Sequence, residues 1–562
     1  MRKAIVLLAV LLLSSALCPA QTSHKRARPA SAHLPGAAIA AMQTINPEHI
    51  RAHVRFLSHD LLEGRGTGQR GGDIAAEYMA TQFALYGLKP AGDNGTYMQK
   101  VPMVGVTTSP ESTYTLVPSD GQPMNLKLLD DYVASNQMQQ PDATINADIV
   151  YVGYGIEAPE YNWDDYKGVD VHGKVLLMLV NEPPSDDPRF FKDKALTYYG
   201  RWTYKFEEAA RKGAVGVILI HKKDMASYGW DVVRNSWSGE EAYLKDDKDP
   251  KLAVASWIQL DVARKLATAL GSDIDKMMED ARSRDFHPVP LQVKLRAHII
   301  SKIRSFDSNN VLAVLPGTAR KLSDQAVIYT AHYDHLGIVP DQAGDNIYNG
   351  ALDNATGCGI LLEIARAYAA GVAKPPRSIL FASVTAEEKG LLGSEYLSRH
   401  LPVSAGKIML DLNYDDVPPL GAPEEVEVTG SERTTFFPVV QAMAKEFRLA
   451  IRPDSRPEAG HYYRSDHFSL ARVGIPSFSI GEGMKYKGHD AAWGMRQAED
   501  YTAKHYHQPS DEYRPEMDFT GDAAMARFGF ALGWAAAIPP QDIGWQKGDE
   551  FEAARLKSQT GQ

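Results

Sequence analysis

The sequence is poor in cysteine and has no surplus of positive charge. Its 562 residues include two cysteines, Cys18 and Cys358, and 60 Lys and Arg against 70 Asp and Glu, which gives a formal charge of −10. Two cysteines cannot build a disulfide scaffold. A negative chain has no field that attracts phosphate backbones or anionic lipid, so we expect no nucleic-acid partner.

Several local motifs of large enzyme classes are also missing. The sequence has no His-Glu-x-x-His, no Gly-x-Ser-x-Gly and no Walker motif, which argues against zincins, serine hydrolases of the nucleophile-elbow type and P-loop enzymes. The glycine-rich stretch Glu63–Gly72 has no strand before it and no Gly-Lys-Ser/Thr at its end. We therefore expect a tight connection there rather than a phosphate loop. No repeat of 20–50 residues supports a solenoid or propeller.

The N-terminus has the pattern of a secretory signal peptide. Arg2 and Lys3 precede an apolar run from Ala4 to Leu13, which is too short to span a membrane, and Ala20 ends a small-residue cleavage site. Leu17, which is not small, precedes Cys18, so a lipid anchor is not expected. The pattern predicts a signal peptide at 1–20, a flexible leader at 21–44, and an exported protein, periplasmic or extracellular, with no stable membrane anchor after cleavage.

The rest of the chain divides into two domains. Residues 45–125 and 296–540 are expected to form one α/β domain, residues 126–295 a second domain, and residues 541–562 a C-terminal tail. Helical periodicity predicts two helices between residues 47 and 87, and strands alternate with helices after residue 300. The fold class is thus α/β, with a mostly parallel mixed central sheet flanked by helices. The clearest strands are Val327–Ala331, Ser378–Thr385, Lys407–Leu412 and Ile475–Ile480, and the clearest helices are Gly359–Ala370 and Thr434–Phe447.

Metal-binding side chains follow these strands. In a parallel sheet, ligands bind beyond the carboxyl ends of the strands. His332 and Asp334 follow the first strand, where the period of two places them on one face, so that Asp334 can accept the ring N–H of a metal-bound His332.

Four further positions carry the same kind of group. Asp353 lies in a polar, glycine-bounded turn, and Glu387 and Glu388 follow the second strand, where extended backbone would point them in opposite directions. A third strand ends at Asp415 and Asp416, and His507 lies in a downstream turn. Imidazoles and carboxylates without a thiolate cluster suit Zn²⁺ best, with Mn²⁺ or Co²⁺ as substitutes.

The motifs HYDHLG, NGALDNATG, TAEEKGLLGS, LNYDD, YYRSDHFSLARVGIPSFSI and YHQPSDEY occur in this order. As a set they resemble metallopeptidase family 28, the co-catalytic zinc exopeptidases that include secreted bacterial aminopeptidases. The resemblance covers residues 305–535 well and residues 47–104 loosely. It implies the zinc-exopeptidase fold, also described as phosphorylase/hydrolase-like, two bound Zn²⁺ ions and peptide substrates.

The resemblance also implies roles for the residues. One zinc is expected on His332 and Asp415, a second on Glu388 and His507, with Asp353 bridging both, Glu387 as general base and Asp334 as the residue that orients His332. The family usually has Asp followed by Met where this chain has Asp415 and Asp416, and Asp411 lies nearby, so three carboxylates compete for that ligand position. The family often has a cis peptide after the bridging aspartate, which predicts one between Asp353 and Asn354.

The middle of the chain resembles a protease-associated domain inserted into the peptidase. The matching segments are Asp170–Pro183 and Ala210–Ile220. Such domains border the active-site entrance in this family, which implies a β-rich domain near the catalytic site.

The most favoured function is an aminopeptidase, in which metal ions activate a water whose proton Glu387 accepts. One alternative is a glutamate-carboxypeptidase-like carboxypeptidase or dipeptidase, which needs basic groups such as Arg464. Another, from a different class, is an inactive receptor-like binding protein on the same fold. Residue preference and oligomeric state are not readable from the sequence. Candidate pocket residues, for each of which a packing role is an equal alternative, are Tyr463, Arg464, Asp466, His467 and Tyr486.

Overall fold

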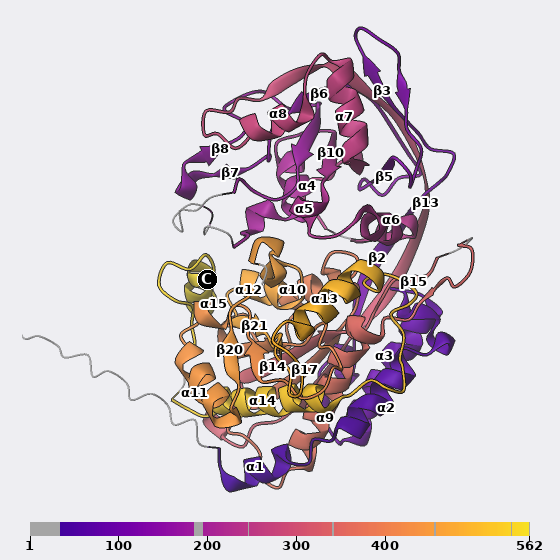
Figure 1. Cartoon of the computed structure of the whole chain (residues 1–562). Helices are drawn as coiled ribbons and strands as arrows, with labels where there is room; N and C mark the ends of the chain where they lie inside the picture. Colours follow the sequence, from indigo (N-terminus) through magenta and orange to yellow (C-terminus); the bar gives the residue numbers. More distant parts are fainter. Residues whose placement is uncertain are drawn as a thin grey trace, which may run out of the picture.

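The computed structural model describes residues 34–184, 191, 195–245, 247–339, 342–454, 457–540 and 542–560. The chain forms two stacked lobes (Figure 1), which we call the upper lobe (residues 109–300) and the lower lobe (the remainder). The expected signal peptide at 1–20 lies outside the described residues. Among the residues described, no helix combines the length and the apolar character needed to cross a bilayer.

The lower lobe is built on a mixed sheet with the strand order β21-β18-β14-β17-β13. β14 (Ala326–His332) pairs in parallel with β17 (Ser378–Val384) and β18 (Ile408–Asn413), and β18 pairs in parallel with β21 (Ser477–Ser479). β13 (Val289–Leu315) closes this row antiparallel to β17. The predicted fold class, a mostly parallel mixed sheet flanked by helices, is confirmed.

Both faces of this sheet are buried, which is why its strands are almost continuously apolar. In β14, Val327 and Tyr329 belong to a large core on one face, whereas Ile328 belongs to a smaller core on the other. The large core is covered by α2 (Pro47–Leu57), α3 (Arg70–Leu85), α9 (Gly357–Ala370), α11 (Phe437–Phe447) and α14 (Thr520–Ala537). The smaller core is covered by α10 (Leu392–Arg399) and α12 (His467–Arg472). The two helices expected between residues 47 and 87 are α2 and α3.

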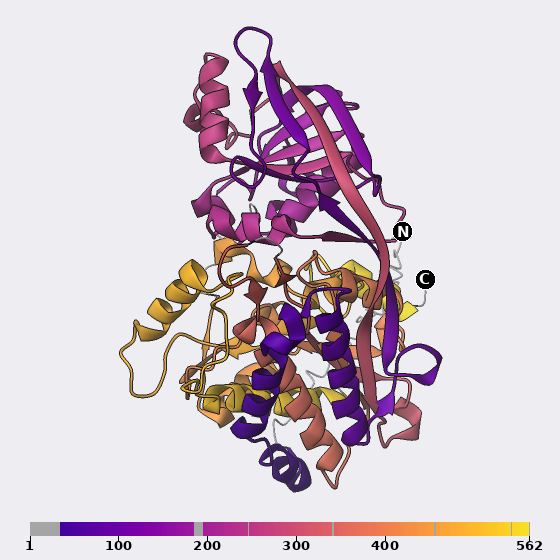
Figure 2. The same ribbon diagram turned by 90° about the vertical axis from the view of Figure 1, so that its right-hand side faces the viewer.

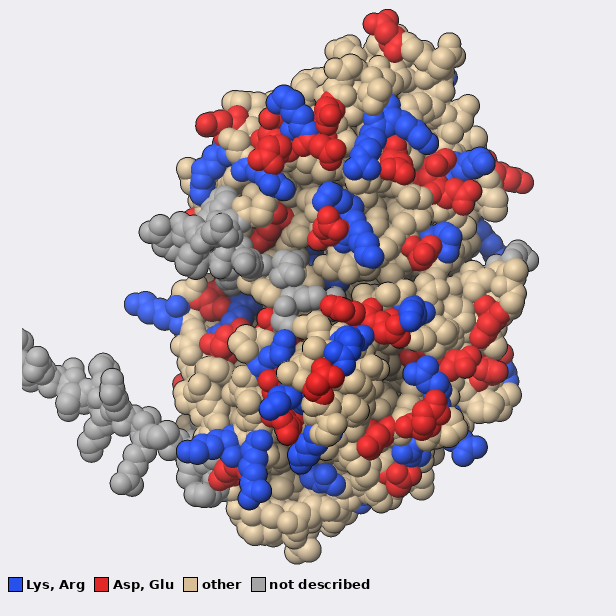
Figure 3. All heavy atoms as spheres, viewed as in Figure 1, with Lys and Arg blue, Asp and Glu red and all other residues tan. Residues whose placement is uncertain are grey.

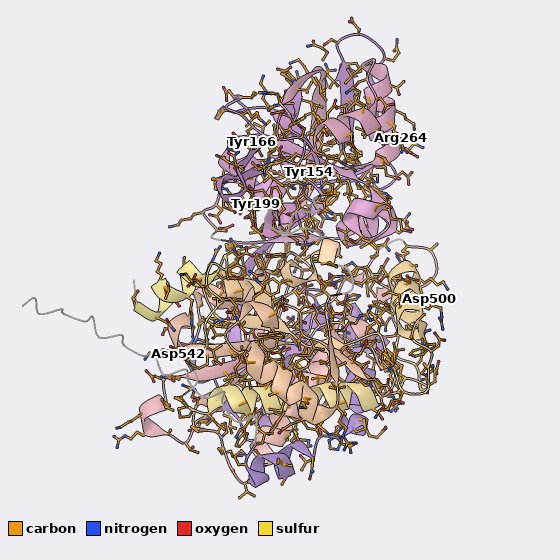
Figure 4. The ribbon with its side chains drawn as sticks, turned by 60° about the vertical axis from the view of Figure 1, so that its left-hand side comes forward. Tyr154, Tyr166, Tyr199, Arg264, Asp500 and Asp542 are labelled. Carbon is orange, nitrogen blue, oxygen red and sulfur yellow. The ribbon has the colours of Figure 1, made fainter. Side chains whose placement is uncertain are left out.

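The upper lobe has its own sheet. β6 (Asp142–Tyr151), β9 (Val175–Leu179), β10 (Gly216–His221) and β12 (Val254–Gln259) run parallel, and β5 (Tyr132–Ser135) ends the row antiparallel to β12. Tyr154 and Tyr166 lie inside this lobe, as Figure 4 shows, and both are buried. Its helices are α4 (Trp202–Arg211), α5 (Lys223–Ala226), α6 (Trp230–Ser238), α7 (Leu260–Ala269) and α8 (Ile274–Asp280).

One strand connects the lobes. β13 pairs with β3 (Thr113–Pro118) and β6 in the upper lobe, then continues to pair with β2 (Met98–Thr108) and β17 in the lower lobe. Figure 2 shows it running through both lobes. The upper lobe therefore begins before the expected boundary at residue 126, because β3 is already part of its sheet. The expected boundary at residues 295/296 falls inside β13. This strand passes from the upper lobe into the lower lobe without a break.

Two segments expected to lie outside the domains are packed. Within the expected leader, α1 (Gly36–Met42) forms a helix that buries Ala38 and Ala41. Within the expected tail, α15 (Glu552–Thr560) buries Arg555, whose guanidinium donates to the carbonyls of Ile408, Ala405 and Ile543. Neither segment has a strong apolar pattern. The buried residues are small alanines in α1 and the long side chain of Arg555 in α15.

Besides several short 3-10 helices, the remaining elements are short or peripheral. They are the strands β1 (Lys89–Pro90), β4 (Met124–Asn125), β7 (Glu157–Ala158), β8 (Trp163–Asp164), β11 (Glu241–Leu244), β15 (Gly337–Ile338), β16 (Ile347–Tyr348), β19 (Glu425–Glu427), β20 (Ala450–Arg452) and β22 (Gly481–Glu482), and the helix α13 (Trp493–Lys504). The face in Figure 3 mixes acidic and basic side chains without a patch of one sign.

Candidate metal centre and active site

The carboxyl ends of three neighbouring strands bring the predicted metal ligands together. His332 ends β14, Glu387 and Glu388 lie in the turn after β17, and Asp415 follows β18. Asp353 arrives from the turn before α9, and its peptide bond to Asn354 is cis, as predicted. These groups come from distant parts of the chain and meet at one edge of the sheet, where parallel α/β folds bind ligands.

Asp353 lies between two sets of ligand atoms. Its Oδ1 is 3.4 Å from His332 Nε2, which is also 3.1 Å from Asp415 Oδ1. Its Oδ2 is 3.3 Å from His507 Nε2, which is also 3.1 Å from Glu388 Oε2. We call the first set of atoms the first metal position and the second set the second metal position. The structure thus brings together all five residues that the resemblance implied as ligands.

The spacing and chemistry of these atoms fit zinc. Two ligand atoms at the usual zinc distance of about 2.0–2.1 Å, in tetrahedral arrangement, lie about 3.3 Å from one another. The four separations above are close to that value. The donors are imidazole nitrogens and carboxylate oxygens, which suit Zn²⁺. Thus the residues present can hold a metal at each position.

The protein also concentrates negative charge here. Burial alone lowers the pKa of His507, but the carboxylates of Glu388 and Asp353 outweigh this and raise that pKa to about 10. Burial raises the pKa of Glu387, and the nearby carboxylates of Glu388 and Asp415 raise it further, against the opposing effect of His332. Crowded buried carboxylates of this kind favour a cation between them.

Asp334 does not orient His332 in the way expected. The Nδ1 atom of His332 lies 3.2 Å from the backbone carbonyl of Asp334, whereas the Asp334 carboxylate is 3.8 Å away, too far for a hydrogen bond. That carboxylate instead accepts hydrogen bonds from the Thr67 hydroxyl at 2.9 Å and the backbone N–H of Glu387 at 3.1 Å. Asp334 therefore holds the turn that carries Glu387.

That turn separates Glu387 from Glu388. The expectation of extended backbone was wrong, because Ala386 has φ 55° and the chain turns directly after β17. The two side chains nevertheless point in different directions, as the sequence predicted. Glu388 faces the second metal position, and Glu387 lines the neighbouring cavity.

His335 belongs to the site although sequence reasoning gave it no role. Its ring is fully buried, and its Nδ1 lies 2.6 Å from Glu388 Oε1. This separation is that of a hydrogen bond and is shorter than the spacing of two ligands on one zinc ion, so His335 contacts Glu388 directly. The second imidazole in HYDHLG was the available signal.

The glycine-rich stretch is also part of the site. Arg65, fully buried, donates to the carbonyls of Leu57, Tyr333, Asn349 and Gly350 at 2.5–2.8 Å. A glycine is required next to it at residue 64, since φ is 66° and a Cβ would lie 2.5 Å from the Gly337 carbonyl oxygen. The segment is a tight connection, as expected, and it additionally ties the turn after β14 and the segment just before Asp353 to α2.

A cavity of about 570 Å³ opens beside the metal positions. Three of the candidate pocket residues, Arg464, His467 and Tyr486, line it, and Asp500 of α13, labelled in Figure 4, lies on its wall. Tyr463 and Asp466 are not among the lining residues. The Tyr463 hydroxyl donates to Glu550 at 2.6 Å and its ring packs edge-on against Phe468, while Asp466 is fully buried.

The charged lining of the cavity is mostly acidic. Arginine occurs at residues 464 and 514, and no lysine is present. The carboxylates are Asp353, Glu387, Asp415, Asp416, Glu427, Glu482, Asp500, Asp511, Glu512 and Glu516. A cavity with this balance attracts cationic groups more strongly than anionic ones, even when two of its carboxylates are taken up by metal.

The chain is similar to proteins that are named as peptidases or aminopeptidases. Residues 310–528 match the model of Peptidase family M28. The chain is 33% identical over 135 residues to Aminopeptidase NAALADL1 of Mus musculus, a match that covers 22% of this chain and 16% of that protein. It is 24% identical over 498 residues to probable leucine aminopeptidase 2 of Aspergillus oryzae, covering 84% of this chain and 83% of that one. The solved structure titled Aminopeptidase from Aneurinibacillus sp. strain AM-1 has the same fold, with a TM-score of 0.51 and 18% identity over 91% of this chain and 97% of that one.

Proposed function

We propose that the protein, whose residues 310–528 match the model of Peptidase family M28, is a zinc-dependent aminopeptidase with two metal ions. The observation that carries the proposal is the position of Asp353, whose two oxygens lie 3.4 Å and 3.3 Å from the Nε2 atoms of two different histidines. A single carboxylate between two ligand sets is the arrangement that a two-metal site needs. The alternative of an inactive binding protein on this fold predicts lost ligands, whereas all five ligand residues are present.

Each residue has a distinct task in this proposal. His332, Asp415, Asp353, Glu388 and His507 hold the metal ions. Zinc, when bound, polarises a carbonyl and makes water more acidic. The Glu387 carboxylate accepts the proton of the attacking water and returns it to the leaving amine. Asp334 keeps Glu387 at the cavity through the hydrogen bond to its backbone N–H.

The cavity favours a free amino terminus over an acidic carboxyl terminus. A peptide ammonium group is attracted by the acidic lining, whereas a substrate carboxylate needs unpaired cations. Arg464 is the basic residue that would bind the substrate carboxylate in a carboxypeptidase. It already donates to the Ala226 carbonyl at 3.1 Å, and its guanidinium lies 5.4 Å from the centre of the Tyr228 ring. The names of the relatives, aminopeptidase and leucine aminopeptidase, point to the same class of reaction.

The test compares three substrates with the zinc-loaded protein. Leucine p-nitroanilide should be hydrolysed, its N-acetyl derivative should not, and an N-acylated peptide ending in glutamate should be stable. Hydrolysis of the third substrate with none of the first would favour the carboxypeptidase. Fewer than one tightly bound zinc per chain, together with no activity on a panel of peptides, would favour a binding protein.

We further propose that the upper lobe is a protease-associated domain and that the protein is exported. The first part is supported by the place of Ser227 and Tyr228, which come from the upper lobe and line the cavity. The second part rests on the signal-like residues 1–20. N-terminal sequencing of the exported protein should begin at Gln21, and retention of residues 1–20 would contradict it.

A further inference from the structure

One helix of the upper lobe reaches the metal centre. α6 lies at the junction of the lobes, where it faces the lower lobe (Figure 1). It is anchored from above, because Val233 is buried in the core of the upper lobe and the Trp237 ring packs against the rings of Trp202 and Phe206. Its last turn carries Asn235 and Ser236, both of which contact His507 of the lower lobe.

The contact with Ser236 fixes the tautomer of His507. The Ser236 hydroxyl oxygen is 2.8 Å from the Val232 carbonyl oxygen and 3.0 Å from His507 Nδ1. A carbonyl can only accept, so the single hydroxyl proton goes to Val232. Ser236 must then accept from His507, and Nδ1 carries the ring proton. In the neutral ring, the form that binds a metal ion, this leaves the lone pair on Nε2, the nitrogen that faces Asp353 and Glu388.

The contact with Asn235 fixes the backbone of the same residue. His507 has φ 54°, a left-handed conformation that a residue with a side chain adopts only when its surroundings hold it. The side-chain amide of Asn235 donates to the His507 carbonyl at 3.1 Å, and both residues are buried. The upper lobe therefore sets both the ring and the main chain of this histidine.

The segment that follows α6 also contacts the turn that carries Glu388. Glu241 of β11 pairs with the ammonium of Lys389, whose Nζ lies 3.7 Å from Glu241 Oε1. Lys389 directly follows Glu388 in the turn after β17. Residues 235–241 thus contact the two segments that carry His507 and Glu388.

We propose that α6 is a positioning element of the second metal position, so that this position is complete only when the upper lobe is docked. This inference rests on the proposed function, since it assumes that His507 binds metal. Ser236 acts through His507 and does not touch the metal or the substrate. Outer hydrogen-bond partners of metal-bound histidines typically change metal affinity or activity by about 10–100-fold when they are removed.

The experiment measures metal binding by three variants of the full-length protein. Ser236→Ala removes the acceptor, and Ser236→Thr keeps it. Thr268→Ala is the matched control, because Thr268 makes the same bond to a carbonyl four residues earlier, that of Arg264, at an exposed position of α7. Arg264 lies on the flank of the upper lobe, away from the junction (Figure 4). Zinc stoichiometry and the affinity of the more weakly bound zinc are measured by chelator competition.

We expect Ser236→Ala to weaken the second zinc by about 10–100-fold and to leave the first unchanged. Ser236→Thr and Thr268→Ala should bind both ions as the wild type does, and all three variants should retain the wild-type circular dichroism spectrum. Wild-type affinity for two zinc ions in Ser236→Ala would overturn the inference and leave the proposed function intact. If the wild type itself binds fewer than two zinc ions, the proposed function fails instead.

Discussion

The Nδ1 atom of His335 lies 2.6 Å from Oε1 of Glu388, and both side chains are buried at the second metal position. Glu388 uses its other oxygen, Oε2, toward His507. The two oxygens thus have separate partners, and the bond to His335 fixes the carboxylate plane. Burial alone would raise the pKa of Glu388, but His507 and His335 lower it well below the usual range and keep it ionised.

Replacing His335 should therefore weaken the second metal position. His335→Phe removes the donor, and we expect the affinity for the second zinc to fall by about 10–100-fold. His335→Asn is the matched variant, because its amide nitrogen can occupy the place of Nδ1. Since His335 Nε2 has no hydrogen-bond partner among the described residues, Asn loses no other bond. Chelator competition measures both variants, and equal affinities would show that the donor has no role.

Glu387→Gln should separate catalysis from metal binding. Gln has nearly the same shape but cannot accept the proton of the attacking water, so the hydrolysis rate should fall by about 10²–10⁴-fold. Because Glu387 is absent from both ligand sets, the variant should still bind two zinc ions. Glu388→Gln is the contrasting variant and should lose the second ion. Near wild-type turnover of Glu387→Gln with two bound ions would remove Glu387 from the role of base.

Asp415 and Asp411 can be separated by the same amide substitution. Asp415 Oδ1 lies 3.1 Å from His332 Nε2, whereas Asp411 is fully buried, and Thr330 donates to it at 3.0 Å. Burial raises the pKa of Asp411 well above its usual value, so Asn resembles its neutral form. We expect Asp415→Asn to lose zinc from the first position and Asp411→Asn to retain it. Elemental analysis of the purified variants measures the zinc that each one retains. Loss of zinc from Asp411→Asn but not from Asp415→Asn would make Asp411 the ligand.

The sequence predicts which candidate ligands meet at one edge of the sheet better than it predicts the residues that hold them in place. His332 and Glu388 follow strands whose apolar runs are unmistakable, and parallel strands deliver such residues to one edge. The partners of these residues come from places that no local pattern connects. Thr67 is 267 residues from Asp334, and Ser236 is 271 residues from His507. The bond that Asp334 makes depends on which donor reaches it, and that is a property of the packed fold.

β13 shows the same limit for the fold. Its buried and exposed residues alternate irregularly along 27 residues, since the strand passes from one sheet into another and its neighbours change. Before Val311, where its last five residues are all apolar, the strand has no long apolar run that would mark it in the sequence. The sequence pattern accordingly placed a domain boundary at residues 295/296, inside this strand.

His53 should make the lower lobe sensitive to acid. It is buried, its Nδ1 lies 2.8 Å from the Tyr78 hydroxyl, and burial lowers its pKa to about 4. The unfolded chain takes up this proton near pH ~6.5 and the folded protein only near pH 4. The contribution of His53 is therefore complete above pH ~6.5 and is lost as the pH falls toward 4, by roughly 3 kcal/mol in all.

The comparison with His53→Gln isolates this effect. Gln can keep a hydrogen bond with Tyr78 but does not titrate. Urea unfolding at pH 7.5, 6 and 5 should show a steeper loss of the free energy of unfolding for the wild type than for the variant. Parallel pH dependences would mean that the pKa of His53 is the same in the folded and the unfolded protein.

Arg65 should be the most sensitive position outside the ligands. Its guanidinium donates to backbone carbonyls of three segments, and no water replaces those donors once the side chain is removed from a buried site. Arg65→Met fills similar space with apolar atoms, so the unpaired carbonyls dominate the cost, which we expect to be about 3–5 kcal/mol of unfolding free energy.

Arg70→Met is the control, because Arg70 is exposed and pairs with Glu63 at 2.6 Å, and its loss should cost no more than about 0.5 kcal/mol. Since one of the carbonyls belongs to Gly350, three residues before Asp353, Arg65→Met should also weaken zinc binding at both positions, while Arg70→Met should not. Equal unfolding free energies for the two variants would show that the loops around Asp353 hold their shape without Arg65.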